Sequence, residues 1–187
     1  MKKLFALLLA AAMLLGGTSA LAADFTFADI AGLEFDFASG VGAWATLLYV
    51  DETGHFTAHY YDADQGDTGD DYPHGTLYEC DYEGLLEIAE KVDDCTYTLN
   101  VAELTYDADR PAEKIVDGIR VVAAPPVGME NAKQLTLYLP GKPVSELPQG
   151  FMDWSHLQLL DETPDTLPWY GLYNAADEVG FVGMQGE

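Results

Sequence analysis

The sequence predicts a mainly β protein: an antiparallel β-barrel or strongly curled sheet, followed by an extended C-terminal arm. Aromatic and β-branched residues occur in short runs, and Gly, Pro and Asp separate these runs. Several runs alternate between apolar and polar residues, as strands with one buried face do. No internal repeat or low-complexity tract interrupts this pattern, and the length suits a single domain.

The first residues predict a signal peptide, 1–22, followed by a single β-rich domain, 23–187. Two lysines precede an apolar run at 4–15, and Ala20 and Ala22 form an A-x-A cleavage site. A membrane anchor would need a longer span of about 20 apolar residues. No cysteine stands near the cleavage site, where a lipid anchor would need one. We therefore expect a secreted protein without a membrane span once the signal is removed.

The strands are expected in order along the domain. Apolar and aromatic runs predict strands at 43–50, 55–61, 76–83, 95–104, 118–124 and 134–139, with weaker candidates at 169–173 and 179–183. Segment 85–92 fits a short helix or a strand, because its apolar residues satisfy both spacings. Residues 140–168 are rich in proline and predict a long ordered connection, with an edge helix around 145–160 as a weaker expectation.

The first predicted hairpin can be assigned a register. A three-residue loop ending at Gly54 fits a turn whose last residue is left-handed, so Val50 pairs with Phe56. One face then carries Trp44, Thr46, Leu48, Val50, Phe56, Ala58 and Tyr60, and the other carries Leu47, Tyr49, His55, Thr57, His59 and Tyr61. The first face is the better core, because a one-residue slip would bury the histidines.

Gly42-Ala43-Trp44, Leu48-x-Val50, the glycine-closed turn and Phe56-x-Ala58-x-Tyr60 resemble the opening hairpin of the calycins. That group includes the lipocalins and avidins, small barrels that hold a ligand inside. The resemblance implies a calycin-like barrel. Ala58 stands where avidins favour glycine, and no biotin-contacting pattern is recognisable on the first strand, so no biotin site is implied.

A second resemblance covers the chain from Phe35 onward. The phrases SGVGAW, GDTGDDYPHGT, LYLPGKPVSELP and LPWYGLYN are similar to those of a set of secreted or lipid-anchored bacterial proteins of unassigned function. This resemblance implies a single β-rich domain and no particular activity.

The charge of the chain limits its partners. The sequence has 32 acidic and 8 basic residues, a formal net charge of −24 that becomes −26 when Lys2 and Lys3 leave with the signal. Such a surface repels phosphate backbones, which argues against a nucleic-acid partner. Divalent cations and basic proteins are compatible with it, and charge also keeps a secreted protein soluble.

The stretch DADQGDTGDDYPHG at 62–75 is the candidate cation site. Its carboxylates are Asp62, Asp64, Asp67, Asp70 and Asp71. It is not an EF-hand, because a loop starting at Asp62 has Gly66 at position five and Pro73 at position twelve. A looser Ca²⁺ site is one interpretation, since crowded carboxylates repel each other. The other is a metal-free turn, for which Asp and Gly are typical.

Two cysteines, Cys80 and Cys95, suggest a disulfide in an exported chain. Such a bridge would stabilise the fold by about 3 kcal/mol. It requires 85–92 to bend, because a strand between the cysteines would separate them by about 9–10 Å, whereas a bridge tolerates about 7 Å between Cα atoms. Two buried thiols are the alternative.

Known catalytic motifs are not found in the sequence, so no catalytic residue is assigned. The sequence contains no G-x-S-x-G, H-E-x-x-H or P-loop motif, and its four histidines do not have zinc-ligand spacing. The remaining candidates are the aromatic residues Trp154, Trp169, Tyr170 and Tyr173, whose rings could stack on a sugar. Alternatively, the C-terminal arm uses them to close one end of the barrel.

These observations favour a secreted, non-catalytic binding module for a small molecule or glycan, held at the barrel mouth or on the aromatic patch. The first alternative is a structural or interaction protein of the cell envelope with a filled barrel. The second is a hydrolase with a carboxylate pair, which predicts a cleft where one acid has a raised pKa beside an ionised one. Function depends on the site rather than on the fold, so the ligand does not follow from the barrel.

Overall fold

The computed structural model describes residues 24–40 and 42–185, so the predicted signal peptide lies outside the described residues. The strands are β1 Leu33–Ala38, β2 Trp44–Val50, β3 His55–Asp64, β4 Thr76–Asp93, β5 Thr96–Tyr106, β6 Glu113–Val116, β7 Ile119–Ala123, β8 Gln134–Tyr138, β9 Tyr170–Asn174 and β10 Val179–Gln185. The helical turns are η1 Phe27–Asp29, η2 Val144–Glu146, α1 Gln149–Met152 and η3 Leu157–Leu159. The predicted fold class, mainly β, is confirmed.

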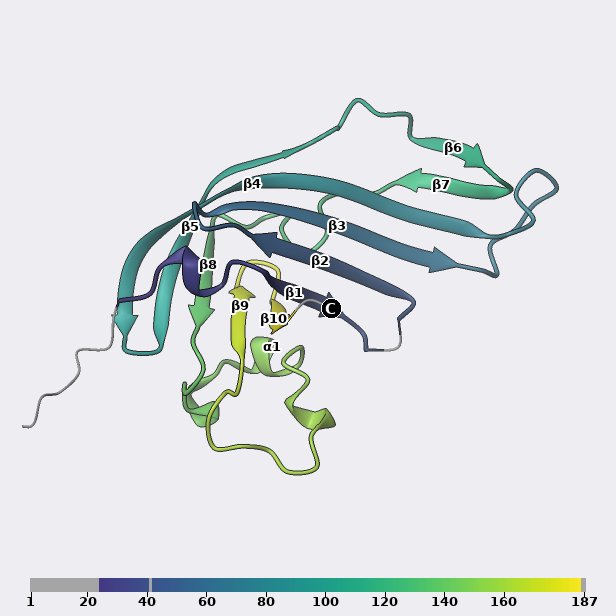
Figure 1. Ribbon diagram of the computed structural model, residues 1–187. Helices are drawn as coiled ribbons and strands as arrows, with labels where there is room; N and C mark the ends of the chain where they lie inside the picture. The colour runs from purple at the N-terminus through teal and green to yellow at the C-terminus, as the bar shows by residue number, and fades with distance from the viewer. Residues whose placement is uncertain (1–23, 41, 186–187) are drawn as a thin grey trace, which may run out of the picture.

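Eight of the strands close into an antiparallel barrel (Figure 1). Their order around the ring is β3, β2, β1, β10, β9, β8, β5 and β4, and β4 pairs again with β3. The closure depends on β4, which runs for 18 residues and contains irregularities that bend it. Its residues 82–85 pair with both β3 and β5, so the ring closes at this point.

The register predicted for the first hairpin is confirmed. Val50 pairs with Phe56, and the Asp51 N–H donates to the His55 carbonyl at 2.8 Å. Gly54 has a φ of +88°, the left-handed conformation that the three-residue loop requires. Segment 85–92, which the sequence left open between a helix and a strand, is part of β4.

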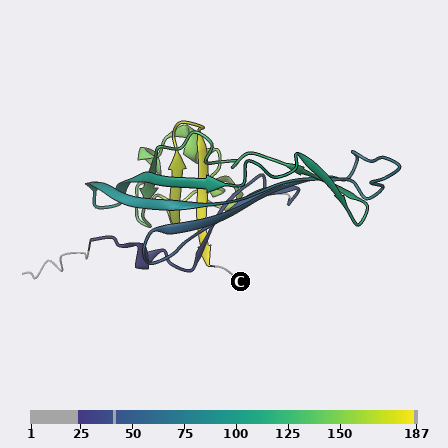
Figure 2. The same cartoon turned by 90° about the horizontal axis from the view of Figure 1, so that it is seen from above.

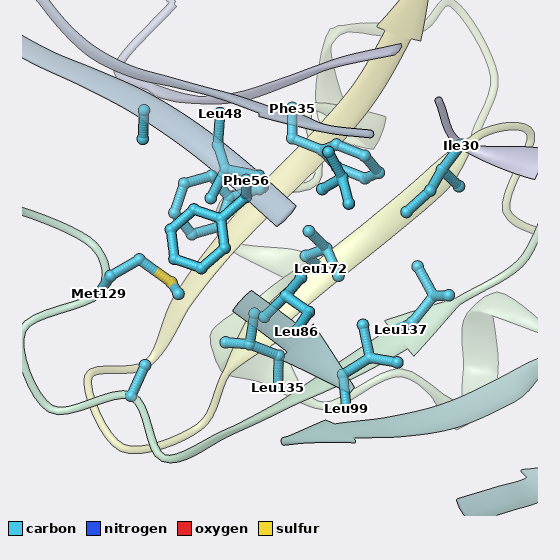
Figure 3. Close-up of a cluster of buried hydrophobic side chains, with 14 of the residues drawn as sticks. Ile30, Phe35, Leu48, Phe56, Leu86, Leu99, Met129, Leu135, Leu137 and Leu172 are labelled. Carbon is cyan, nitrogen blue, oxygen red and sulfur yellow. The ribbon is translucent and has the colours of Figure 1, made fainter. Parts of the chain in front are cut away.

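Side chains fill the barrel interior. The inward-facing residues labelled in Figure 3 include Phe35, Leu48, Phe56, Leu86, Leu99, Leu135, Leu137 and Leu172. These residues and Phe181 are each at most 1% exposed. Met129, from the segment between β7 and β8, joins this cluster and is fully buried. Trp44 and Tyr60 pack against it from the edge, while His55 and His59 lie on the opposite face of β3 and remain partly exposed. The face assigned to the core is therefore correct.

A smaller sheet projects from the barrel. β7 pairs in parallel with the first residues of β4, and β6 pairs with β7 through a turn at Asp117 and Gly118. Both views show β6 and β7 extending away from the ring beside the distal parts of β3 and β4 (Figures 1 and 2). Strands β1 and β6 were not predicted. In β6, Ile115 and Val116 are about half exposed, at 50% and 45%.

The proline-rich segment 140–168 lies on the outer face of β8, β9 and β10 and forms a second core there. This core contains Tyr138, Leu147, Phe151, Leu157, Leu167 and Tyr173. The ring of Phe151 lies over Gly171 of β9, where a Cβ would approach it to 2.4 Å. Lys142 anchors the segment through its Nζ, which donates to Asp93 at 2.9 Å and Glu146 at 2.7 Å. In place of the predicted helix around 145–160, the structure has only η2, α1 and η3.

The disulfide that the sequence left open between Cys80 and Cys95 is not supported, because both residues are free cysteines. Cys80 is buried in β4 opposite Tyr60, whereas Cys95 lies beyond the end of β4, in the turn that leads to β5. β4 continues to Asp93, so an extended stretch at about 3.3 Å per residue separates the two thiols. The irregularities in β4 curve the strand but do not fold it back on itself, so they do not bring the two thiols together.

Candidate functional site

The five aspartates of the acidic stretch are spread over a strand end and a loop. Asp62 and Asp64 end β3, while the other three lie in the loop before β4. Among the described residues, no group of three or more His, Cys, Asp or Glu side chains is placed to hold a metal ion. The calcium site therefore stays a prediction that this arrangement does not support.

Protein groups satisfy two of these carboxylates. Asp64 Oδ1 accepts the Gly66 N–H at 2.8 Å and the Asp67 N–H at 3.1 Å, which closes a tight turn. Asp67 pairs with the Arg120 guanidinium, whose carbon lies 4.7 Å from the Tyr72 ring centre. Desolvation disfavours the charged form of Arg120, but the negative charge of Asp67 and its hydrogen bond contribute to outweighing it, so the pKa of Arg120 is raised. A cation from the protein itself thus reduces the repulsion in the loop.

The four aromatic candidates do not form one site. Trp154 packs edge-on against Phe37 at 4.7 Å between ring centres, and its Nε1 donates to the Glu178 carbonyl at 3.0 Å. Tyr173 is buried in the second core. Trp169 and Tyr170 do lie together. With Asp29, Leu33, Pro140, Pro168, Gly183, Met184 and Gln185 they line a hollow of about 390 Å³, called here the end groove.

A larger hollow lies on the outer face of the barrel wall. This outer groove has a volume of about 510 Å³ and is lined by Tyr49, Thr57, Ala58, His59, Asp81, Tyr82, Glu83, Thr105, Tyr106 and Asp107. Its residues come from β2, β3, β4 and the end of β5, which are neighbours in the ring. A second hollow of about 340 Å³ adjoins it and shares Tyr49 and Thr57 as a common border.

The strand register builds the outer groove. Tyr49 pairs with Thr57, Thr57 with Glu83, and Glu83 with Thr105, so one row of outward side chains crosses four strands. A second row contains His59 and Asp81, which are also paired across strands. Inward residues of the same strands are buried, which fixes the outward direction of these rows.

Hydrogen bonds hold several groove side chains in place. The Tyr49 hydroxyl donates to Glu34, the next residue of the row, and this bond raises the pKa of Tyr49. His59 Nδ1 lies 2.7 Å from Asp81 Oδ1, and the His59 ring stacks on Tyr61 with centres 6.0 Å apart. These contacts fix the orientation of the Tyr49 and His59 rings.

The outer groove is strongly negative. Asp81, Glu83 and Asp107 line it, and its lining residues in the described structure include neither Lys nor Arg. The Lys and Arg side chains that the structure places in polar contacts make them elsewhere: Lys91, Arg110, Lys114, Arg120 and Lys142 contact carboxylates or carbonyl oxygens. Among the basic residues only histidines contact groove carboxylates in the described structure, His59 with Asp81 and His55 with Glu83.

The carboxyl with a raised pKa lies outside all of these hollows. Burial raises the pKa of Asp36, with His156 opposing and Glu34 reinforcing the change, and its Oδ1 has no hydrogen-bond partner. Asp36 is on β1, paired with Leu47 and Val182. It lines none of the four hollows described for residues 24–40 and 42–185. The acid pair in a cleft that a carboxylate hydrolase requires is not found at this position.

The outer groove was not predicted from the sequence. Tyr49, Thr57 and His59 were assigned to the solvent face, but their partners on β4 and β5 were not known. The alternation of Asp81 and Glu83 with buried Tyr82 marks them as outward residues, and this was the signal available. No comparison with known proteins, whether by family models, curated proteins or solved structures, found a match. No helix in the described part of the chain is long and apolar enough to cross a membrane.

Proposed function

We propose that this protein is a secreted, non-catalytic binding module that takes a small molecule or glycan in the outer groove. The observation that carries the proposal is the groove itself: about 510 Å³, built on paired strands and lined by two exposed tyrosine rings and three carboxylates. That volume lies in the usual range for ligand sites, about 300–1,000 Å³. Because side chains fill the barrel interior, the proposal places the ligand outside the barrel rather than at its mouth.

A binding screen tests this proposal. The purified protein would be screened against glycans and metabolites with and without Ca²⁺, with melting temperature and calorimetry as readouts. Tyr106→Ala should abolish binding of each hit, since Tyr106 is 45% exposed and its removal leaves the core intact. Met184→Ala is the matched control, because Met184 is 42% exposed and lines the end groove.

The outcomes separate the two grooves. Loss of binding in Tyr106→Ala with retention in Met184→Ala supports the outer groove. The reverse pattern would move the site to the end groove, where Trp169 and Tyr170 would stack on the ligand as the sequence suggested. A screen without hits, on protein whose melting shows it to be folded, would contradict a ligand-binding role.

The second candidate is a structural or interaction protein of the cell envelope. The filled interior favours it, and so does the projecting sheet, whose outermost strand β6 exposes Ile115 and Val116. It predicts that the protein associates with envelope components through this sheet and that Ile115→Lys prevents the association while leaving the barrel folded. Unchanged association in that variant would rule out this surface.

A further inference from the structure

We infer that the outer groove selects organic cations, meaning ligands that carry an ammonium or guanidinium group on an apolar body. This inference rests on the proposed function and adds the charge and chemical class of the ligand.

The first argument is the charge that lines the groove. Asp81, Glu83 and Asp107 contribute three carboxylates. His59 lies 2.7 Å from Asp81 and His55 lies 3.7 Å from Glu83, so the two histidines, even if both were charged, would leave one carboxylate without a partner. Asp81 and Glu83 have side chains that are 84% and 61% exposed, so their oxygens are accessible to a ligand. An anionic ligand would meet repulsion from all three groups, whereas a cation would be attracted by each.

The second argument is the pair of tyrosines, which supplies the apolar surface that a cluster of acids alone lacks. Tyr49 and Tyr106 are 41% and 45% exposed, and both line the same hollow. The Tyr49 hydroxyl is bonded to Glu34, so the ring remains as an apolar surface of fixed position. Aromatic faces attract ammonium and guanidinium groups and also pack against an apolar body.

The third argument separates an organic cation from a metal ion. No group of three or more metal-binding side chains converges among the described residues, including those of the groove. The hollow is also far larger than one ion needs, since about 510 Å³ corresponds to a molecule with many heavy atoms. A ligand whose body fills the space between the tyrosines and whose charge meets the carboxylates uses both features.

The fourth argument is the field of the whole protein. With a formal net charge of −24, the chain attracts cations and repels anions at long range. Arg120 and Lys142 are engaged with carboxylates away from the groove, so they do not weaken the local field.

An amide NMR titration with three probes of one shape tests the inference: phenethylamine, phenethyl alcohol and phenylacetate. They share the phenethyl-type frame and differ in charge, being cationic, neutral and anionic. We expect the amine to shift groove amides saturably and to bind about tenfold more tightly than the alcohol, because each exposed ion pair contributes roughly two- to fivefold. Phenylacetate should bind more weakly than the alcohol, and added salt should weaken the amine alone.

Two variants separate local from global charge. Glu83→Gln with Asp107→Asn removes two of the three groove carboxylates, so the preference for the amine over the alcohol should fall to the roughly two- to fivefold that the remaining ion pair with Asp81 gives. Asp161→Asn with Glu162→Gln removes the same charge from exposed residues that do not line the groove, and it should preserve the preference. An equal loss in both variants would overturn the inference, because the selection would then come from the overall field.

The titration also distinguishes the two proposals. If the alcohol or phenylacetate shifts groove amides as strongly as the amine, the selection of cations is wrong and the binding site stands. If none of the probes shifts groove amides but a screened glycan does, the groove is again a binding site that does not select cations. If neither probes nor screened compounds shift them, both proposals fail.

Discussion

Gly84 offers a direct test of how the barrel closes. It lies where β4 pairs with β3 and β5 at once, opposite Phe56 on one side and Leu104 on the other. A Cβ added to Gly84 would stand 2.0 Å from the Glu103 carbonyl oxygen and 2.7 Å from ring carbons of Phe56. The nearest obstacle is backbone of a paired strand, so it cannot move away without disturbing the pairing.

The size of the effect follows from these contacts. Overpacking a core costs about 1–3 kcal/mol, and a clash with backbone belongs at the upper end, so Gly84→Ala should lose about 3 kcal/mol of unfolding free energy. Out of a typical total of about 5–15 kcal/mol, this loss is readily measured. Urea denaturation followed by circular dichroism gives the value for the variant and for the parent protein.

Two further variants make the reasoning specific. Gly66→Ala is the control, because its Cβ would meet only Asp64 Oδ1 at 3.4 Å, and a surface change of this kind costs about 0.5 kcal/mol or less. Adding Phe56→Leu to Gly84→Ala removes the ring contact but keeps the carbonyl clash. The double variant should therefore lose less unfolding free energy than the sum of the losses in the two single variants. A Gly84→Ala protein that unfolds at the urea concentration of the parent would refute the closure described for β3, β4 and β5.

Three other predictions concern pH, an ion network and the thiols. Burial raises the pKa of Asp36 above 3.8, so the stability of the protein falls as pH rises through the folded-state pKa. Asp36→Asn should therefore raise the melting temperature at neutral pH and change it little near about pH 3. A melting temperature below that of the parent protein at neutral pH would contradict this. Lys142→Met should cost about 1–3 kcal/mol in urea denaturation through the loss of charge-assisted hydrogen bonds, whereas Lys133→Met, an exposed control, should cost far less. A thiol reagent should titrate both cysteines in denaturant and only Cys95 in the folded protein, because Cys80 is buried. If neither cysteine reacts in denaturant, Cys80 and Cys95 form a disulfide.

The sequence predicted those strands whose own residues carry the signal. Alternation along β2 and β3, together with Gly54, determined their register without knowledge of other strands. β1 has the same alternation, Leu33-Glu34-Phe35-Asp36-Phe37, but two carboxylates in so short a run resemble a loop. β6 has only four residues, yet the Asp117-Gly118 turn, with φ values of +51° and +78°, is a hairpin signal that could have revealed it.

The candidate site required information that the sequence does not carry locally. The row that places Thr57 beside Glu83 and Thr105 depends on the pairing of three strands, and a register shift between Leu85 and Leu86 alters that pairing further along β4. The same continuous strand separates Cys80 from Cys95. The spacing of Cys80 and Cys95 along the chain allowed a disulfide or two free thiols, and it could not distinguish between them.

The projecting sheet divides the protein into parts with different local stability. β7 joins the ring through four residue pairs with β4, and the four residues of β6 are all exposed. We expect amide protons in β6 and β7 to exchange with solvent through a local opening that leaves the ring closed. Amide protons at the centre of the ring should exchange only through global unfolding. Proteases that need a flexible segment would therefore cut the outlying strands first, and the barrel would survive the cut.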